Sequence, residues 1–229
     1  MKRRAFLVLS GALALPWRAF AAGTKIGIVG SGRVGSAIGA AWVKAGHEVM
    51  FSSRNLDNDK ALASRLGGGA RAGTPREAAA FGEVVMVSVP YHALPSVGKD
   101  LGDLLKGKVV IDTCNPFPGR DGEIAEWARK KGAGLAAAEL MPGARLVRAF
   151  NAIGAARMGA QHESPGSVGM PIASDDAQAA EIASRLIRDV GYAPVLIGGL
   201  AKGRHLVPGT ALAGERSAEE IRRIAATLD

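Results

Sequence analysis

The sequence has little cysteine, few aromatic residues and no long run of one charge. Its 229 residues contain a single cysteine, Cys114, which excludes an internal disulfide and a multi-thiolate zinc or iron–sulfur site. The four histidines are scattered at positions 47, 92, 162 and 205, without the spacing of metal ligands. No Ser-His-Asp order and no obvious lysine base can be recognised. The sequence therefore does not indicate catalysis by a protein nucleophile or a metal ion.

The composition is that of an ordinary globular chain, with 48% apolar and 22% charged residues. The formal net charge is +8, but four of the positive charges lie within the first 21 residues. The remaining Lys and Arg residues are spread along the chain and form no basic stripe. A nucleic-acid partner is therefore not expected. Cys114 follows an apolar run, so we expect it to be a buried small side chain.

Residues 1–21 have the features of an export signal. A charged Lys2-Arg3-Arg4 start precedes a short apolar stretch, and Ala19-Phe20-Ala21 fits a small-x-small cleavage pattern. Arg3 and Arg4, followed by Ala-Phe-Leu, resemble the twin-arginine signal, which directs folded proteins out of the cytoplasm. The prediction is a periplasmic protein without stable membrane insertion after cleavage. An uncleaved N-terminal anchor is the alternative.

From residue 24 onward, strand-like apolar runs alternate with amphipathic helical patterns, which predicts an α/β fold with a parallel sheet. Strands are expected at Lys25–Val29, Glu48–Phe51, Val84–Val89, Lys108–Ile111, near 145–149, near 168–173 and at Ala193–Ile197. Helices are expected at Val34–Lys44, Asp57–Leu66, Thr74–Ala80, Leu94–Leu105, near 122–131, at Asp175–Val190 with Ser174 as its N-cap, and at 217–228. Residues 198–215 are expected to form a loop or short helices.

A glycine-rich turn has the context of a dinucleotide-binding site. Gly30-Ser31-Gly32-Arg33-Val34-Gly35 directly follows the first strand and opens the first helix. Gly30 would permit the tight turn, Gly32 would let the backbone approach a pyrophosphate, and Gly35 would let the helix pack on the strand. The helix N-terminus would supply N–H groups and partial positive charge for the phosphates.

The end of the second strand favours NADP over NAD. An NAD site usually places Asp or Glu there to bind the ribose 2′-hydroxyl. This strand instead ends in Phe51-Ser52-Ser53-Arg54-Asn55, without a carboxylate. The Ser53 hydroxyl and the Arg54 guanidinium suit a 2′-phosphate, and Arg33 could add a further charge or stack on the adenine.

Four segments, in order and with ordinary spacing, carry a resemblance to the family of F420-dependent NADP oxidoreductases, which covers nearly the whole chain after residue 21. They are the turn with Ser53-Arg54, residues 87–91 (VSVPY), residues 107–116 (GKVVIDTCNP) and residues 147–153 (VRAFNAI). The resemblance implies a Rossmann doubly wound parallel sheet, with an NADP-binding domain at 22–155. A small C-terminal extension, residues 156–229, would complete the pocket for a second cofactor.

The resemblance also implies roles for residues beyond the turn. Pro90 and Tyr91 would lie near the nicotinamide, and Asn115 would lie on the same rim. Asn151, Ala152 and Ile153 would form the floor on which the second redox partner stacks. Residues 198–208, which would help to shape the pocket of the second cofactor, depart from the family's pattern.

The expected activity is hydride transfer between NADPH and F420, a flavin or another small acceptor. In such chemistry the cofactors react and the protein positions them, so no catalytic side chain is assigned. His92 is expected to be a solvent-facing residue at a helix start. The alternative is an NADP-binding sensor or partner subunit without turnover. The sequence leaves the formation of a homo-oligomer open.

Overall fold

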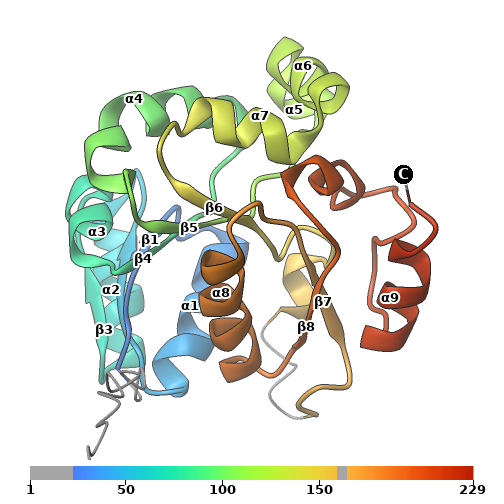
Figure 1. The fold of residues 1–229 in the computed structure, drawn as a ribbon. Helices are drawn as coiled ribbons and strands as arrows, with labels where there is room; N and C mark the ends of the chain where they lie inside the picture. The colour runs from blue at the N-terminus through green and yellow to red at the C-terminus, as the bar shows by residue number, and fades with distance from the viewer. Residues whose placement is uncertain (1–22, 159–163, 229) are drawn as a thin grey trace, which may run out of the picture.

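The computed structural model describes residues 23–158 and 164–228, and its centre is a six-stranded parallel sheet in the order β3-β2-β1-β4-β5-β6 (Figure 1). Its strands are β1 (Lys25–Val29), β2 (Glu48–Ser52), β3 (Ala70–Ala72), β4 (Val84–Val87), β5 (Val109–Asp112) and β6 (Arg145–Arg148). This strand order is that of a Rossmann sheet, which confirms the predicted fold class. The export-signal prediction for residues 1–21 lies outside the described residues.

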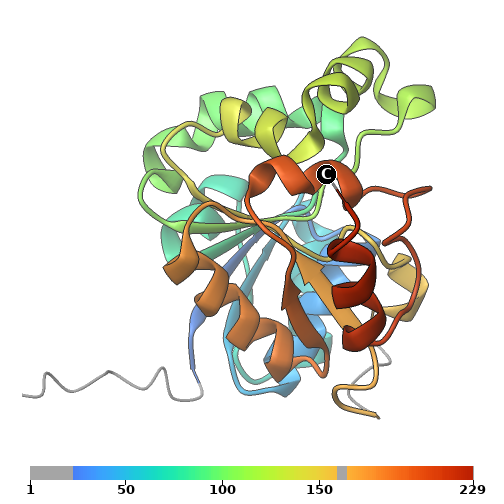
Figure 2. The ribbon, with the colours of Figure 1, turned by 45° about the vertical axis from the view of Figure 1, so that its right-hand side comes forward.

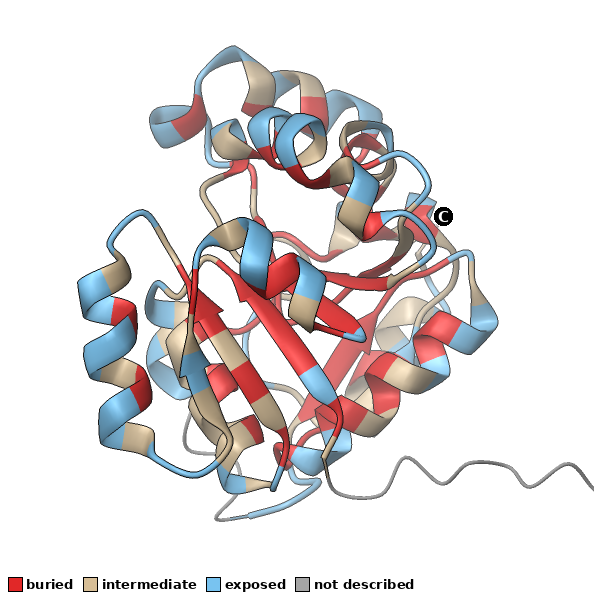
Figure 3. Ribbon diagram, turned by 90° about the vertical axis from the view of Figure 1, so that its left-hand side faces the viewer, coloured by how far each residue is buried: buried red, intermediate tan, exposed pale blue. Residues whose placement is uncertain are grey.

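Helices cover both faces of the sheet, as the continuous apolar character of its strands requires. On one face, α1 (Arg33–Lys44) and α8 (Ala177–Asp189) pack on strand residues such as Ile28 and Met86. On the other face, α4 (Leu94–Leu105) and α7 (Ala133–Leu140) pack on residues such as Val87 and Val110. Figure 3 shows that the central strands are almost entirely buried. The remaining helices of the domain are α2 (Leu56–Leu66), α3 (Pro75–Phe81), α5 (Pro118–Asp121) and α6 (Glu123–Lys131).

The C-terminal part forms a small second layer beside β6. Strands β7 (Gly169–Ile172) and β8 (Ala193–Leu196) pair in parallel, and α9 (Ala218–Ala225) packs on them (Figure 2). Two backbone hydrogen bonds between Arg148 and Ala173, 2.9 and 3.1 Å long, join β6 to β7 in an antiparallel bridge. The C-terminal part is therefore connected directly to the end of the last strand of the main sheet.

Two local expectations need correction. The N-cap of α8 is Asp176, whose side chain accepts the N–H of Ala179, rather than Ser174. The Ser174 hydroxyl instead donates to the carbonyl of Leu146, 2.7 Å away. Strand β3 and helix α7 were not expected, because β3 has only three residues and the Ala-rich α7 has no polar face of its own. Cys114 is buried and unpaired, as expected.

Candidate nucleotide and acceptor site

The glycine-rich turn lies where β1 meets α1, at the carboxyl edge of the sheet. Gly30 has φ +103°, and the N–H groups of Gly30 and Ser31 both donate to the Ser52 carbonyl at 2.9 Å. A Cβ on Gly35 would lie 2.1 Å from the Gly30 carbonyl oxygen, so the helix packs on the turn only with glycine there. A Cβ on Gly32 would meet no protein atom within 4 Å. Gly32 therefore faces open space, as a pyrophosphate-binding position should.

The N-terminus of α1 is suited to bind an anion. Gly32 is its N-cap, no side chain caps its first turn, and that turn contains no acidic residue. Its backbone N–H groups therefore keep their capacity for an external acceptor. The Arg33 side chain is the first of the helix and is exposed beside the turn.

Two adjoining hollows open along this edge of the sheet. The first, of about 770 Å³, extends from the turn over the end of β2 to the start of α4. It is lined by Val29, Gly30, Gly32, Ser53, Arg54, Pro75, Ser88, Val89, Pro90, His92, Ala93, Ser96, Val97, Asp100 and Leu101. The predicted residues Gly30, Ser53 and Arg54 thus line the same hollow, and Arg54 makes no ion pair with any described residue.

The second hollow, of about 610 Å³, lies over the ends of β5 and β6. It is lined by Gly32, Arg33, Val34, Ser88, Val89, Pro90, Thr113, Asn115, Phe117, Arg120, Phe150, Asn151, Ala152, Ile153, Gly154, Ala155, Pro208, Gly209, Ala213 and Gly214. Gly32, Ser88, Val89 and Pro90 line both hollows. The two therefore form one continuous groove across the middle of the sheet, at the crevice where Rossmann folds bind ligands.

Three predicted site residues lie outside both hollows. Ser31 and Gly35 belong to the turn itself, where Ser31 hydrogen bonds to Asp59. The Tyr91 side chain is fully buried, and its hydroxyl donates to the Ala133 carbonyl at 3.4 Å. Burial raises the pKa of the Tyr91 hydroxyl, which therefore stays protonated. The Tyr91 side chain thus lies in the core beneath α7 and lines neither hollow.

The end of β6 turns sharply into the floor of the second hollow. Phe150 has φ +62°, which is rare for a residue other than glycine and is a form of strain found at functional sites. Its ring is held edge-to-face between Trp42 and Tyr192, with ring centres 6.1 Å apart in both cases. This turn places residues 151–153 along the hollow. The side-chain amide of Asn151 is buried and has no hydrogen-bond partner among the described residues.

A buried ion pair supports this floor from behind. Arg148 and Asp112 are fully buried and face each other in the register of β5 and β6. Arg148 Nη1 donates to Asp112 Oδ2 at 2.5 Å, and Nη2 donates to Asn115 Oδ1 at 3.0 Å. The Asn115 amide in turn donates to the Asn151 carbonyl at 2.8 Å. Arg148 therefore fixes the orientation of Asn115 at the rim, a role that the sequence analysis did not assign.

Asp121 connects the walls of the two hollows. Its buried carboxylate accepts hydrogen bonds from His92 Nδ1 at 2.8 Å and from Arg120 Nε at 2.9 Å. Burial opposes its ionisation, but the bonds from Arg120, the Phe117 N–H and His92 outweigh burial and hold the pKa of Asp121 below its ordinary value. His92 is exposed at the start of a short helix, as expected, and its ring is in addition held by Asp121.

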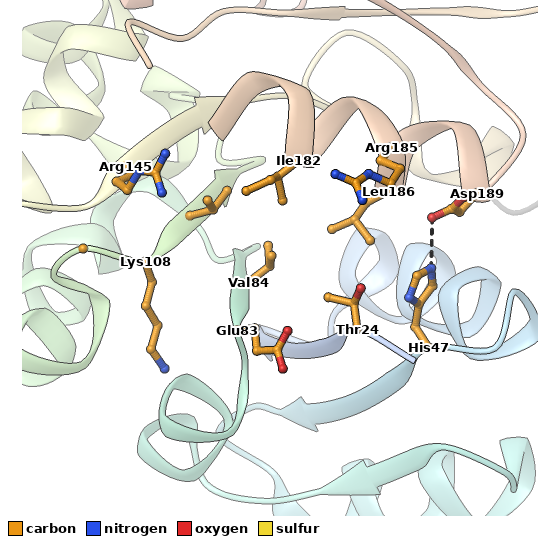
Figure 4. Close-up of a pocket in the computed structure, with 12 residues that line it drawn as sticks. Thr24, His47, Glu83, Val84, Lys108, Arg145, Ile182, Arg185, Leu186 and Asp189 are labelled. Atoms are coloured by element: carbon orange, nitrogen blue, oxygen red, sulfur yellow. Dashed lines mark hydrogen bonds and ion pairs between the residues drawn. The ribbon is translucent and has the colours of Figure 1, made fainter. Parts of the chain in front are cut away.

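A separate cavity of about 310 Å³ lies at the opposite end of the sheet, beneath α8 (Figure 4). Several of its charged side chains have partners within the protein. Lys108 Nζ donates to the carbonyls of Ala79 and Gly82 at 2.7 and 2.8 Å, which caps the end of α3. His47 Nε2 lies 3.1 Å from Asp189 Oδ2. This cavity borders the amino ends of the strands and contains no part of the glycine-rich turn.

Comparison with known proteins agrees with the nucleotide site. Residues 25–116 match the family described as NADP oxidoreductase, coenzyme F420-dependent. The chain is 27% identical to an F420-dependent NADP reductase of Methanothermobacter thermautotrophicus over 194 residues, which covers 79% of this chain and 83% of that protein. A solved structure of a hypothetical protein from Sinorhizobium meliloti has a TM-score of 0.72 at 27% identity, and covers 83% of this chain and 93% of that one.

The chain is also 30% identical over 185 residues to metalloreductase STEAP3 of Rattus norvegicus. This match covers 80% of the chain but only 35% of the metalloreductase. The fold and the turn are those of a Rossmann dinucleotide-binding domain, and these matches show its similarity to NADP-dependent oxidoreductases. The family model matches residues 25–116, so the similarity to this family covers the part of the chain that contains the glycine-rich turn.

Proposed function

We propose that the protein transfers a hydride between NADPH and a small acceptor such as F420 or a flavin. The observation that carries this proposal is the continuous groove, in which the glycine-rich turn separates a hollow at the end of β2 from a second hollow at the ends of β5 and β6. One hollow would take the adenosine end of the dinucleotide and the other its nicotinamide together with the acceptor.

The residues present fit an NADP molecule. The N–H groups of α1 and the open space at Gly32 suit the pyrophosphate, and the exposed Arg54 suits the 2′-phosphate. When bound, the dinucleotide supplies the hydride chemistry. Pro90, Asn115, Asn151, Ala152 and Ile153 would wall the nicotinamide and the acceptor.

The lining of the second hollow favours positioning over acid–base catalysis. Its only ionisable side chains are Arg33 and Arg120, because no Asp, Glu, His, Lys or Cys lines it among the described residues. Hydride transfer between the nicotinamide ring and a ring of the acceptor requires that the two be held face to face and that water be excluded, and it does not require a protein base. Phe117 is 40% exposed at this hollow, with the Arg120 guanidinium 4.9 Å from its ring centre. Its ring is thus available to stack against a planar acceptor.

The assignment of Arg54 predicts a change of cofactor preference in one variant. Wild-type protein is expected to bind NADPH more tightly than NADH. Arg54→Asp should lose about 1–3 kcal/mol of NADPH binding, because a charge-assisted contact is replaced by repulsion. NADH binding should change much less. Fluorescence titration of both dinucleotides measures this, and equal wild-type affinities would contradict the assignment.

We further propose that the protein folds around its dinucleotide before export to the periplasm. Arg3 and Arg4 carry this proposal, because the twin-arginine route transports folded proteins. A bound dinucleotide would stabilise the fold by about 2.7 kcal/mol at a hundredfold excess over its dissociation constant. Within the described residues, no helix is long and apolar enough to cross a membrane.

Replacing Arg3 and Arg4 together by lysine should keep the protein in the cytoplasm, as measured by cell fractionation. Lysine preserves the positive charge, so the variant isolates the twin-arginine pattern itself. Undiminished export, or a mature protein that retains residues 1–21, would overturn this route.

A further inference from the structure

A buried carboxylate lies behind the wall on which the 2′-phosphate would bind. Asp59, in the first turn of α2, has only 1% of its surface exposed. Its Oδ2 accepts the hydroxyl of Ser53 at 2.8 Å, and its Oδ1 accepts the hydroxyl of Ser31. No described Lys, Arg or His forms an ion pair with it. Asp59 lies within α2, beyond the end of β2 at Ser52, so the sequence itself shows no carboxylate at the end of that strand.

The hydrogen bonds of Ser53 determine what it offers to the first hollow. Its hydroxyl proton has two acceptors within the protein, Asp59 Oδ2 at 2.8 Å and the Asn55 carbonyl at 3.2 Å, and its oxygen already accepts the N–H of Asn55 at 3.1 Å. Ser53 therefore presents a remaining lone pair to a ligand. A lone pair suits a ribose 2′-hydroxyl, which can donate a proton, but not a 2′-phosphate oxygen, which needs a donor.

The charge of Asp59 acts in the same direction. A 2′-phosphate held by Arg54 beside Ser53 would lie one hydroxyl group away from the carboxylate. Like charges at that distance repel, and burial removes the solvent screening that would weaken the repulsion. Arg54 therefore attracts the 2′-phosphate while Asp59 opposes it.

We infer that Asp59 is a specificity-determining residue that limits the preference of this protein for NADP over NAD. The inference rests on the proposed function, since it assumes that the first hollow takes the adenosine end of the dinucleotide. Wild-type protein then binds NADPH with only a modest advantage over NADH. The lone pair that Ser53 presents, with its proton held by Asp59, favours the 2′-hydroxyl of NADH, and Arg54 supplies the remaining preference for the 2′-phosphate.

The direct test is Asp59→Asn, with Asp57→Asn as the matched control. Asparagine keeps the shape and one carbonyl acceptor but removes the charge. Asp57 lies in the same first turn of α2, with 93% of its side chain exposed. Asp59→Asn is expected to lower the Kd for NADPH about tenfold, with NADH changed by less than about twofold. Asp57→Asn should alter neither Kd. Titration of both dinucleotides, with a melting curve of each variant, measures this.

Each other outcome overturns the inference. Equal weakening of NADPH and NADH by Asp59→Asn would mean that Asp59 only positions the serines. An equal gain in Asp57→Asn would mean that general surface charge is responsible. If Asp59→Asn does not fold, the affinity of Ser53→Ala for NADPH is measured instead. A loss of affinity below about twofold supports the inference. A loss of about tenfold would mean that Ser53 donates a hydrogen bond to the phosphate, and would overturn the inference. If wild-type protein binds neither dinucleotide, the proposed function itself fails.

Discussion

Gly32→Val is expected to abolish dinucleotide binding and leave the fold intact. A Cβ at Gly32 would meet no protein atom within 4 Å, and its φ is −68°, which any residue can adopt. A valine side chain would therefore extend into the groove and not into the protein. Gly32 lines both hollows. The valine side chain would therefore occupy the space in which the pyrophosphate must approach the backbone. We expect the affinity for NADPH to fall by at least about a hundredfold, since a clash at the pyrophosphate cannot be relieved by a small shift.

Gly35→Val is the matched control on the same turn. Its Cβ would lie 2.1 Å from the Gly30 carbonyl oxygen, so this variant should lose stability as well as binding. Circular dichroism melting curves and NADPH titration separate the two effects. Unchanged NADPH affinity in Gly32→Val would show that the dinucleotide does not bind at this turn.

Arg148→Met is expected to destabilise the fold by about 3–5 kcal/mol, because it leaves the fully buried Asp112 carboxylate without its counterion. That loss is a large part of the stability of an ordinary domain. The same change removes the hydrogen bond that orients Asn115, so the floor of the second hollow should loosen as well. Urea unfolding, followed by tryptophan fluorescence, measures the difference.

The double variant Asp112→Asn with Arg148→Met tests the cause of this loss. Asparagine keeps the acceptor that Asp112 provides for the Cys114 N–H, at 2.8 Å, but removes the unpaired charge. A substantial part of the lost stability should return. If Arg148→Met costs less than about 1 kcal/mol, the buried pair does not have the structural role assigned to it here.

Local sequence patterns were sufficient for much of the fold. The β1–α1 turn could be predicted, because its three glycines lie within six residues and each has a known role in the backbone geometry of such turns. Strands β1, β2, β4 and β5 could be predicted from continuous apolar runs. Helix α7 could not, because its burial depends on a distant contact: a Cβ on Gly134 would lie 2.2 Å from the Leu200 carbonyl oxygen.

The site was predictable only where its residues are neighbours in sequence. Asp59, Asp121 and Arg148 act through partners on other elements, and no short motif marks such pairs. Arg148 could have been noticed, because an arginine within the apolar run of β6 requires a buried partner, and Asp112 ends the neighbouring strand. Tyr91 adjoins Pro90 in sequence, but its side chain enters the core while Pro90 lines the groove.

Turnover of NADPH by the purified wild-type protein decides whether it is a reductase. The protein is mixed with NADPH and, in separate reactions, with oxidised F420 or a flavin, and the absorbance of the reduced nicotinamide is followed. We expect NADPH to be consumed together with an equal amount of at least one acceptor, and Gly32→Val to abolish this reaction. Tight binding of NADPH without its oxidation by any of these acceptors would contradict the account, and would instead identify a non-catalytic NADP-binding protein.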